Sequence, residues 1–194
     1  AQDAGFLKKH GITHLVSVAE ECPPSAPVQT LHLALRDSPL TDVRSRFSEV
    51  FDFVDQARAS AKPGAALIHC FEGKNRSAAF VIAYVMREEK LNLQDAFARV
   101  KGVRSLVDPN IGFLKQLRDF ELELGCEALS LPFDAEACRD LLDLELISVA
   151  ELARYTDLKE LTYEGNNVRI REGPKESAEA ARSAGLNHQG ERAS

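Results

Sequence analysis

The sequence lacks several features that would assign it to a broad class. No apolar run reaches the length of a transmembrane helix, and the first residues lack the basic-then-apolar pattern of a secretory signal peptide. No basic excess is present either: the formal net charge is -6, which argues against a nucleic-acid binder with a basic surface. We therefore expect a soluble cytoplasmic protein, with the nucleus as a second location, and neither a membrane nor a nucleic acid as partner.

The cysteines and histidines lack the spacing of a metal site. The sequence has no C-x-x-C pair, and none of its five histidines stands at zinc-ligand spacing from a cysteine. The four cysteines are Cys22, Cys70, Cys126 and Cys138. We expect reduced thiols, no metal and no cofactor.

What is present is an alternation of strand-like and helix-like segments. The predicted strands are Thr13–Val18, Thr30–Leu35 and Ala65–His69. Helical spacing of apolar residues follows in four places: around Phe47 to Val54, over Ser77–Glu89, after Asn92, and over Asn110–Leu124. This order predicts an α/β fold, in which a mostly parallel central sheet is flanked by helices.

The stretch HCFEGKNRS, residues 69–77, joins a predicted strand to a predicted helix. It places Cys70 at the end of the strand and Arg76 just inside the helix. Backbone N–H groups of residues 71–76 can then converge beside the helix N-terminus, a position that attracts a tetrahedral dianion. Gly73 permits an unusual φ and a close ligand approach, and Arg76 can donate to two phosphate oxygens. The same field should lower the pKa of the Cys70 thiol and make it a nucleophile.

Three other interpretations of this stretch are weaker. A nucleotide phosphate loop needs a glycine and a Ser or Thr where the sequence has Ile68 and Asn75. The Asn75-Arg76-Ser77 triplet is a formal glycosylation sequon, but nothing else indicates secretion. A buried structural role is common for an isolated cysteine. The full pattern, however, arises by chance on the order of once in ten thousand chains at ordinary residue frequencies.

The same stretch resembles the signature loop of cysteine-dependent protein phosphatases, which is His-Cys, five residues, Arg and then Ser or Thr. Val107–Leu117, VDPNIGFLKQL, resembles the Pro-Asn-x-Gly-Phe-x-x-Gln-Leu element of the dual-specificity group. LKKHGITHLVSV resembles that group's early helix and strand. The chain thus looks like a dual-specificity phosphatase, similar to MAP-kinase-phosphatase-like and plant-type members.

The resemblance implies a role for each residue of the loop. Cys70 would attack phosphorus and form a phosphocysteine, while Ser77 would hydrogen-bond the sulfur and ease its departure. His69 would order the loop from beneath. The substrate-binding set would be Phe71, Glu72, Gly73, Lys74, Asn75 and Arg76. Asn110 would brace the loop by hydrogen bonds, with a simple helix N-cap as the alternative.

A carboxylic acid must protonate the leaving group, since a tyrosinate or seryl alkoxide leaves slowly at neutral pH. Asp37 follows the strand LHLALR and occupies the family's general-acid position, so it would donate this proton and later act as the base for water. Asp42 lies in the same segment and is the competing candidate for the acid. We expect Asp42 to cap the following helix or to be solvated.

The implied activity is hydrolysis of phosphotyrosine, phosphoserine and phosphothreonine in phosphoproteins. Only 69 residues precede Cys70, fewer than in tyrosine-specific relatives, which implies a shallow pocket. A MAP kinase substrate follows from kinship alone. The alternatives are a pseudophosphatase that serves as a phosphoprotein-binding adaptor, and a phosphatase for a nonprotein phosphate such as an RNA 5′ end or a phosphoinositide.

The resemblance also divides the chain. Residues 1–126 would form the catalytic domain, and the family's opening strand is expected to be missing. Residues 131–186 are expected to form a small helical region, with a capping box at Ser148–Glu151 and a helix between Pro174 and Gly185. This region is expected to pack on the catalytic domain as a clasp, with a partner-binding module as the alternative. Residues 187–194 should form a loose tail.

Overall fold

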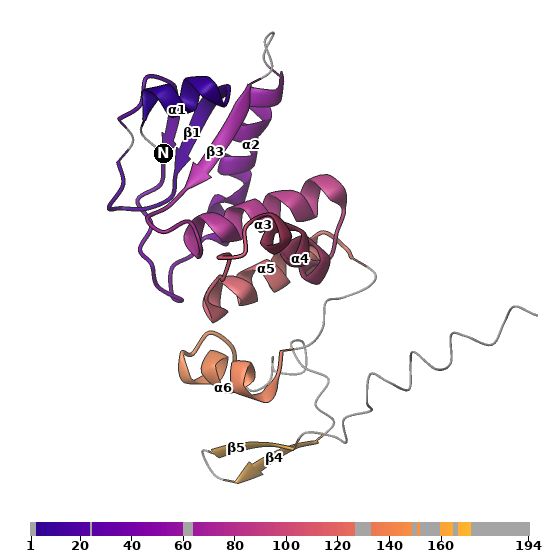
Figure 1. Cartoon of the computed structure of the whole chain (residues 1–194). Coiled ribbons are helices and arrows are strands. Elements are labelled where there is room, and N and C mark those ends of the chain that lie inside the picture. The colour runs from indigo at the N-terminus through magenta and orange to yellow at the C-terminus, as the bar shows by residue number, and fades with distance from the viewer. Residues whose placement is uncertain are drawn as a thin grey trace, which may run out of the picture.

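Three parallel strands, in the order β2-β1-β3, form the central sheet of the computed structural model (Figure 1). The strands are β1 (Ile12–Ser17), β2 (Gln29–His32) and β3 (Ala65–His69). In the register, Leu15 pairs with Thr30 on one side and Leu67 on the other. The last four residues of β1 are all buried, as expected for a central strand that is covered on both faces. The structure describes residues 3–23, 25–59, 64–126, 133–148, 151, 160–164 and 167–171.

Helices pack against this sheet, and further helices pack on α3 as a second layer (Figure 1). They are α1 (Ala4–Lys9), the short 3-10 helix η1 (Arg44–Arg46), α2 (Phe47–Ala59), α3 (Arg76–Glu89), α4 (Leu93–Val103) and α5 (Ile111–Glu123). Helix α2 packs on β1 and β3, whereas α3 lies between the sheet and helices α4 and α5. The expected α/β fold with a parallel sheet and flanking helices is confirmed. Within the described ranges, none of the helices combines the length and apolar character that a membrane span requires.

Helix α3 is the buried centre of the molecule. Most of its residues are buried, which agrees with its almost uniformly apolar sequence. Phe80 on this helix contacts Phe47 edge to face, with 5.4 Å between ring centroids, and Phe47 contacts Phe120 of α5 at 5.3 Å. Burial of each such ring contributes about 1.5–3 kcal/mol to stability. This packing fixes the first turn of α3, and therefore the loop that precedes it.

Among the described residues beyond 126, the first element is a helix that packs on α5. Helix α6 (Ala135–Asp143) starts at Asp134, whose carboxylate accepts a hydrogen bond from Ala137 N at 2.8 Å. Its buried residues Cys138 and Leu141 cluster with Ile147 and pack against Ile111 of α5. This contact agrees with the expected clasp.

For residues 160–164 and 167–171, the expectation of helix was wrong. Strands β4 (Glu160–Glu164) and β5 (Asn167–Arg171) form an antiparallel hairpin instead. The sequence signal was alternation with period two, ELTYE and NVRIR, separated by the two residues Gly165 and Asn166. At Ser148 the backbone N–H donates to the Glu151 carboxylate at 2.9 Å, which is one half of the predicted capping box. The predicted helix from Pro174 to Gly185 and the predicted tail lie outside the described residues.

Candidate active site

The phosphate-sized loop runs from Cys70 at the end of β3 to Arg76, the first residue of α3. It is held between the sheet and the buried helix, so its two ends cannot move independently. Gly73 has φ +72°, a conformation that glycine adopts without strain. The N-cap of α3, Asn75, makes no side-chain cap hydrogen bond, because its side chain is directed elsewhere. The Asn75 side chain therefore does not occupy the first-turn N–H groups of α3, which face Cys70 and the position of a ligand.

The Cys70 sulfur is buried and surrounded by hydrogen-bond donors. The Ser77 hydroxyl lies 3.2 Å from Sγ, and Gly73 N–H donates to Sγ at 3.3 Å. Burial is the largest influence and by itself raises the pKa of Cys70. The Ser77 hydroxyl, the N–H groups of Ser77 and Gly73, and the charge of Arg76 together outweigh it and lower the pKa below the ordinary thiol value of 9.0. The thiolate is therefore easier to form here than in water.

Arg76 is only 1% exposed, and its Nη1 atom is bound by two acceptors. Its Nη1 donates to the Glu21 carboxylate at 2.7 Å and to the Leu35 carbonyl at 2.9 Å. The hydrogen bond from Arg76 is the main reason that the pKa of Glu21 is lowered, so Glu21 remains a carboxylate. Arg76 Nη2 lies 3.2 Å from Asp37 Oδ2, and its buried Nε has no hydrogen-bond partner among the described residues. A buried donor without a partner is costly unless a ligand satisfies it.

Asp37 and Asp42, the two acids considered for proton transfer, take different places. Asp37 reaches the loop: besides its ion pair with Arg76, it accepts a hydrogen bond from Asn75 Nδ2. Asp42 accepts from Ser45 N at 3.1 Å, so its carboxylate is used in the local turn at the start of η1, where Val43 is the N-cap residue. Only Asp37 of this pair is seen to contact the loop in the described part of the chain.

The segment between α4 and α5 fastens the outer side of the loop. Asp108 N donates to Lys74 O at 2.8 Å, and Asn110 N donates to Asn75 Oδ1 at 2.9 Å. The Asn110 side chain is used differently, since its Oδ1 accepts from Phe113 N at 3.0 Å and caps α5. Asn110 therefore braces the loop through its backbone, while its side chain takes the role given above as the alternative.

His69 lies beneath the loop. Its Nδ1 is 3.3 Å from the Cys70 carbonyl oxygen, which can only accept, so Nδ1 carries the proton. Burial is the main reason that the pKa of His69 is lowered, and the ring is therefore neutral at pH 7. Its Nε2 is buried without a partner in the described part of the chain. This geometry suits a residue that orders the backbone at Cys70.

Helix α5 positions the segment that carries Asp37. Gln116 Oε1 accepts from Val43 N at 2.8 Å and from Arg44 N at 3.0 Å, and its Nε2 donates to Thr41 O at 2.9 Å. The backbone of Pro39 lies so close to Gly112 that a Cβ there would be 2.0 Å from Pro39 O. A larger residue at 112 would push this segment away from the loop.

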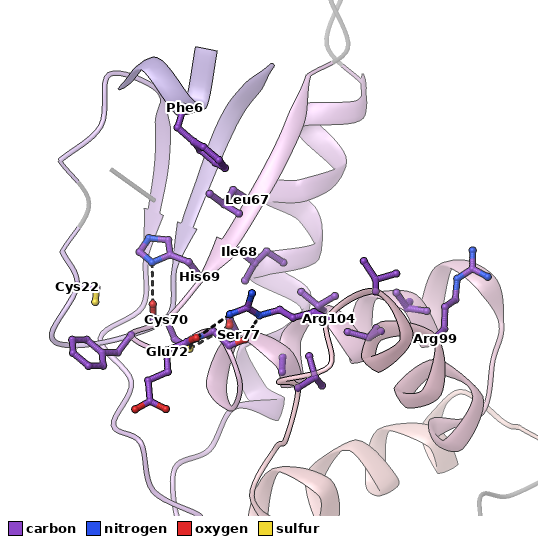
Figure 2. A pocket seen from close by; sticks show the side chains of 18 residues that line it. Phe6, Cys22, Leu67, Ile68, His69, Cys70, Glu72, Ser77, Arg99 and Arg104 are labelled. Atoms are coloured by element: carbon purple, nitrogen blue, oxygen red, sulfur yellow. Dashed lines mark hydrogen bonds between the residues drawn. The ribbon is translucent and has the colours of Figure 1, made fainter. Parts of the chain in front are cut away.

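A cavity of about 840 Å³ flanks the loop between β3, α3 and α4 (Figure 2). Its walls are mainly apolar and include Leu67, Val81 and Val100. Among the described residues, its lining includes positions 70–73 of the loop but neither Arg76 nor Asp37, so it lies beside the phosphate position. Figure 2 shows Arg104 extending along it to the loop backbone. No cluster of three or more His, Cys, Asp or Glu side chains in the described ranges is arranged to hold a metal ion.

The sequence did not indicate four residues of this site. Gln116 and Gly112 lie inside the Val107–Leu117 element, where the interpretation stopped at Asn110. Arg104 lies just before that element, and Glu21 has no local pattern at all. The spacing of the Val107–Leu117 element was a signal for Gln116 and Gly112, because its Gly and Gln share one face of a helix at i and i+4.

Comparison with known proteins assigns the arrangement. Residues 1–123 match the family model for the dual specificity phosphatase catalytic domain. The chain belongs to the dual specificity phosphatase family. Its sequence is 36% identical over 123 residues to dual specificity protein phosphatase 1 of Arabidopsis thaliana, covering 62% of this chain and 61% of that one. It is 39% identical over 120 residues to protein-tyrosine-phosphatase MKP1 of the same plant, covering 60% of this chain and 15% of that one.

A solved dual specificity phosphatase has the same fold. The crystal structure of a mouse member complexed with zinc tungstate superimposes with a TM-score of 0.58 at 34% identity, covering 62% of this chain and 76% of that one. The resemblance to dual-specificity phosphatases, including plant and MKP-named members, is thus confirmed. The chain spans less than two thirds of the length of the two plant relatives.

Proposed function

We propose that the protein is a dual-specificity protein phosphatase, which hydrolyses phosphotyrosine, phosphoserine and phosphothreonine through a phosphocysteine. The observation that carries this proposal is the unpartnered, buried Nε of Arg76, beside the uncapped start of α3 and the lowered-pKa thiol of Cys70. Together these groups supply a dianion site and a nucleophile at one point. Family membership supports the same assignment.

In the first step, the Cys70 thiolate attacks phosphorus and the P–O bond to the substrate breaks. Arg76 Nε and Nη2, with the loop N–H groups, hold the nonbridging oxygens. Phosphate replaces Asp37 as the partner of Arg76 Nη2, and Asp37, in its acid form, gives its proton to the departing oxygen. Protonation is needed because a free alkoxide is a poor leaving group.

In the second step, Asp37 takes a proton from water, and the water oxygen attacks the phosphocysteine. The S–P bond breaks, inorganic phosphate forms and Cys70 returns as a thiolate. The Ser77 hydroxyl, 3.2 Å from Sγ, stabilises the departing sulfur by a hydrogen bond.

The proposed substrates are phosphoproteins, and a MAP kinase is the finer proposal. A relative named MKP1 supports it. Because turnover requires a reduced Cys70, we place the protein in a reducing compartment, the cytoplasm or the nucleus. All four cysteines are free in the structure.

A substrate panel tests the proposal. We expect the full chain, in a chelator, to release phosphate from phosphotyrosyl and phosphothreonyl peptides, and to do so at higher kcat/KM than from phosphoinositide or RNA 5′-triphosphate. Preferred turnover of either nonprotein substrate would contradict the substrate class. Binding of phosphopeptide without turnover would contradict the activity and favour an adaptor.

Removing the Gln116 amide should impair proton donation. Gln116→Ala leaves Thr41 O and the N–H groups of Val43 and Arg44 without their partner, so the Asp37 segment is held less firmly. We expect kcat for a phosphothreonyl peptide to fall about 10-fold, because general acid catalysis depends on geometry, with a smaller loss for an activated aryl phosphate. Gln116→Glu keeps both accepting contacts and should lose less. Equal losses for the two substrates would contradict a role through Asp37.

A further inference from the structure

Arg104, which follows the last residue of α4, bonds directly to the backbone of the phosphate loop (Figure 2). Its Nε donates to Gly73 O at 2.8 Å, and its Nη2 donates to Glu72 O at 3.1 Å. One planar guanidinium thus satisfies two successive carbonyls. This is a two-pronged contact, which the single ammonium of lysine cannot reproduce.

The base of the Arg104 side chain is itself fixed. Arg104 N donates to Val100 O at 3.0 Å, and its carbonyl accepts from Val107 N at 3.1 Å. The residue is therefore tied to the end of α4 and to the following turn. The backbone that carries the guanidinium is therefore fixed by hydrogen bonds on both sides.

Gly73 and Arg104 fit one another. A Cβ on Gly73 would lie 3.0 Å from Nη2 of Arg104, which is tighter than most real Cβ contacts, and 3.5 Å from its Cζ, which is ordinary contact. The glycine therefore admits the guanidinium as well as meeting the φ of +72°. From the sequence, the glycine was expected to permit an unusual φ and a close ligand approach, but no contact with Arg104 was expected.

The contact has a consequence for Cys70 because a peptide group is planar, with N–H and C=O on opposite sides. The Glu72 carbonyl, which Arg104 holds, belongs to the same peptide group as Gly73 N–H. That N–H donates to Cys70 Sγ at 3.3 Å. In the same way, the Gly73 carbonyl shares its peptide group with the Lys74 N–H. Holding the two carbonyls outward turns both N–H groups toward the sulfur and the phosphate position.

We propose that Arg104 is a positioning residue: its guanidinium holds the Glu72 and Gly73 peptide groups in the orientation that presents their N–H groups to Cys70 and to the phosphate. This inference rests on the proposed phosphatase function. It adds a residue that does not touch the reacting atoms but acts through the loop backbone.

Arg104→Ala and Arg104→Lys test the proposal, with Arg99→Ala as the matched control. Arg104→Lys keeps the positive charge but loses the two-pronged hydrogen bond to the carbonyls of Glu72 and Gly73. This variant remains informative if Arg104→Ala unfolds. Arg99 lies on α4, lines the same cavity and pairs with Glu89 at 2.9 Å. Its removal therefore takes one positive charge from the same wall. Thermal unfolding of each variant shows which of them are folded.

The first readout is the rate of alkylation of Cys70 by iodoacetamide against pH, followed on the Cys70 peptide by mass spectrometry. The second is the inhibition or binding constant of inorganic phosphate. We expect both Arg104 variants to raise the alkylation midpoint by about one pH unit, because the thiolate loses an oriented donor. Phosphate should bind about 10-fold more weakly to both, as expected for misdirected hydrogen bonds.

Arg99→Ala should match the wild type in both the alkylation midpoint and the phosphate constant. Every variant leaves the other charged and titratable groups at the loop unchanged: His69, Glu72, Lys74, Arg76, Asp37, Glu21 and Asp108.

Turnover gives a third readout, in which we expect kcat/KM of the Arg104 variants to fall up to about 100-fold through misplacement of the loop. Wild-type midpoints in both Arg104 variants would overturn the proposal. The proposal would also be overturned if Arg104→Lys behaved like the wild type while Arg104→Ala was impaired, because charge alone would then suffice. An equal shift of the alkylation midpoint in Arg99→Ala would overturn it too. If the wild type has no turnover, the proposed function fails, while alkylation and phosphate binding still decide the role of Arg104.

Discussion

Replacing Cys70 with serine is expected to abolish turnover, lowering kcat/KM for an aryl phosphate by more than about 10⁴-fold, as loss of a covalent nucleophile does. A serine hydroxyl is not ionised at neutral pH, whereas the surroundings of Cys70 lower the pKa of the thiol. The serine Oγ can still meet Ser77 and Gly73 N–H, so the loop should remain formed. Phosphopeptide binding should therefore persist while hydrolysis is lost.

The pH dependence follows from the same thiol. Reactive thiolate forms as the pH rises through the pKa of Cys70, and that pKa lies below 9.0, so the rising limb of activity should appear below the ordinary thiol range. Cys126→Ser is the control, because this thiol lies outside the site and burial raises its pKa. It should keep wild-type activity. Measurable turnover by Cys70→Ser would exclude Cys70 as the nucleophile.

The second large effect is expected for Asp37→Asn. Asparagine retains an oxygen that can accept from Asn75 Nδ2, but it cannot donate a proton to the leaving group. We expect kcat for a phosphothreonyl peptide to fall at least about 100-fold, within the range of general acid catalysis. The loss should be smaller for an aryl phosphate with an acidic leaving group.

Asp42→Asn provides the matched comparison, measured with the same two substrates. Asp42 accepts from Ser45 N at the start of η1, and the side-chain oxygen of asparagine can accept the same hydrogen bond. This variant should behave like the wild type. The assignment of the acid fails if Asp42→Asn is the slower enzyme, or if Asp37→Asn loses the same factor with both substrates.

The sequence predicted the parts of the site whose functional residues lie next to one another in the chain. His69 to Ser77 lie on one stretch, and the requirement for a nucleophile, a glycine and an arginine at fixed spacing is visible there without any fold. Helix α3 was also predictable, because a helix buried on all sides is apolar on all sides. The parallel sheet followed from strands that alternate with helices.

The supports of the site were not predictable in this way, because they join positions far apart in the chain. Arg104 meets Gly73 across 31 residues, and Gln116 meets Val43 across 73. Glu21 meets Arg76 across 55. Such contacts depend on how α4, α5 and the sheet pack together. The local spacing marked Gln116 as a residue of interest but did not indicate its partner, and no local pattern marked Arg104 or Glu21. The β4–β5 hairpin was missed for a different reason: its period-two alternation was visible but was interpreted as helix.

The proposed mechanism requires a covalent bond between Cys70 and phosphorus. The most direct measurement is acid quenching of the enzyme during turnover of an aryl phosphate, followed by mass spectrometry of the Cys70 peptide. We predict one added phosphoryl group on Cys70, and more of it in Ser77→Ala, because the sulfur then leaves more slowly. Rapid turnover with an unmodified Cys70 in both enzymes, or a phosphoryl group on another residue, would contradict the account.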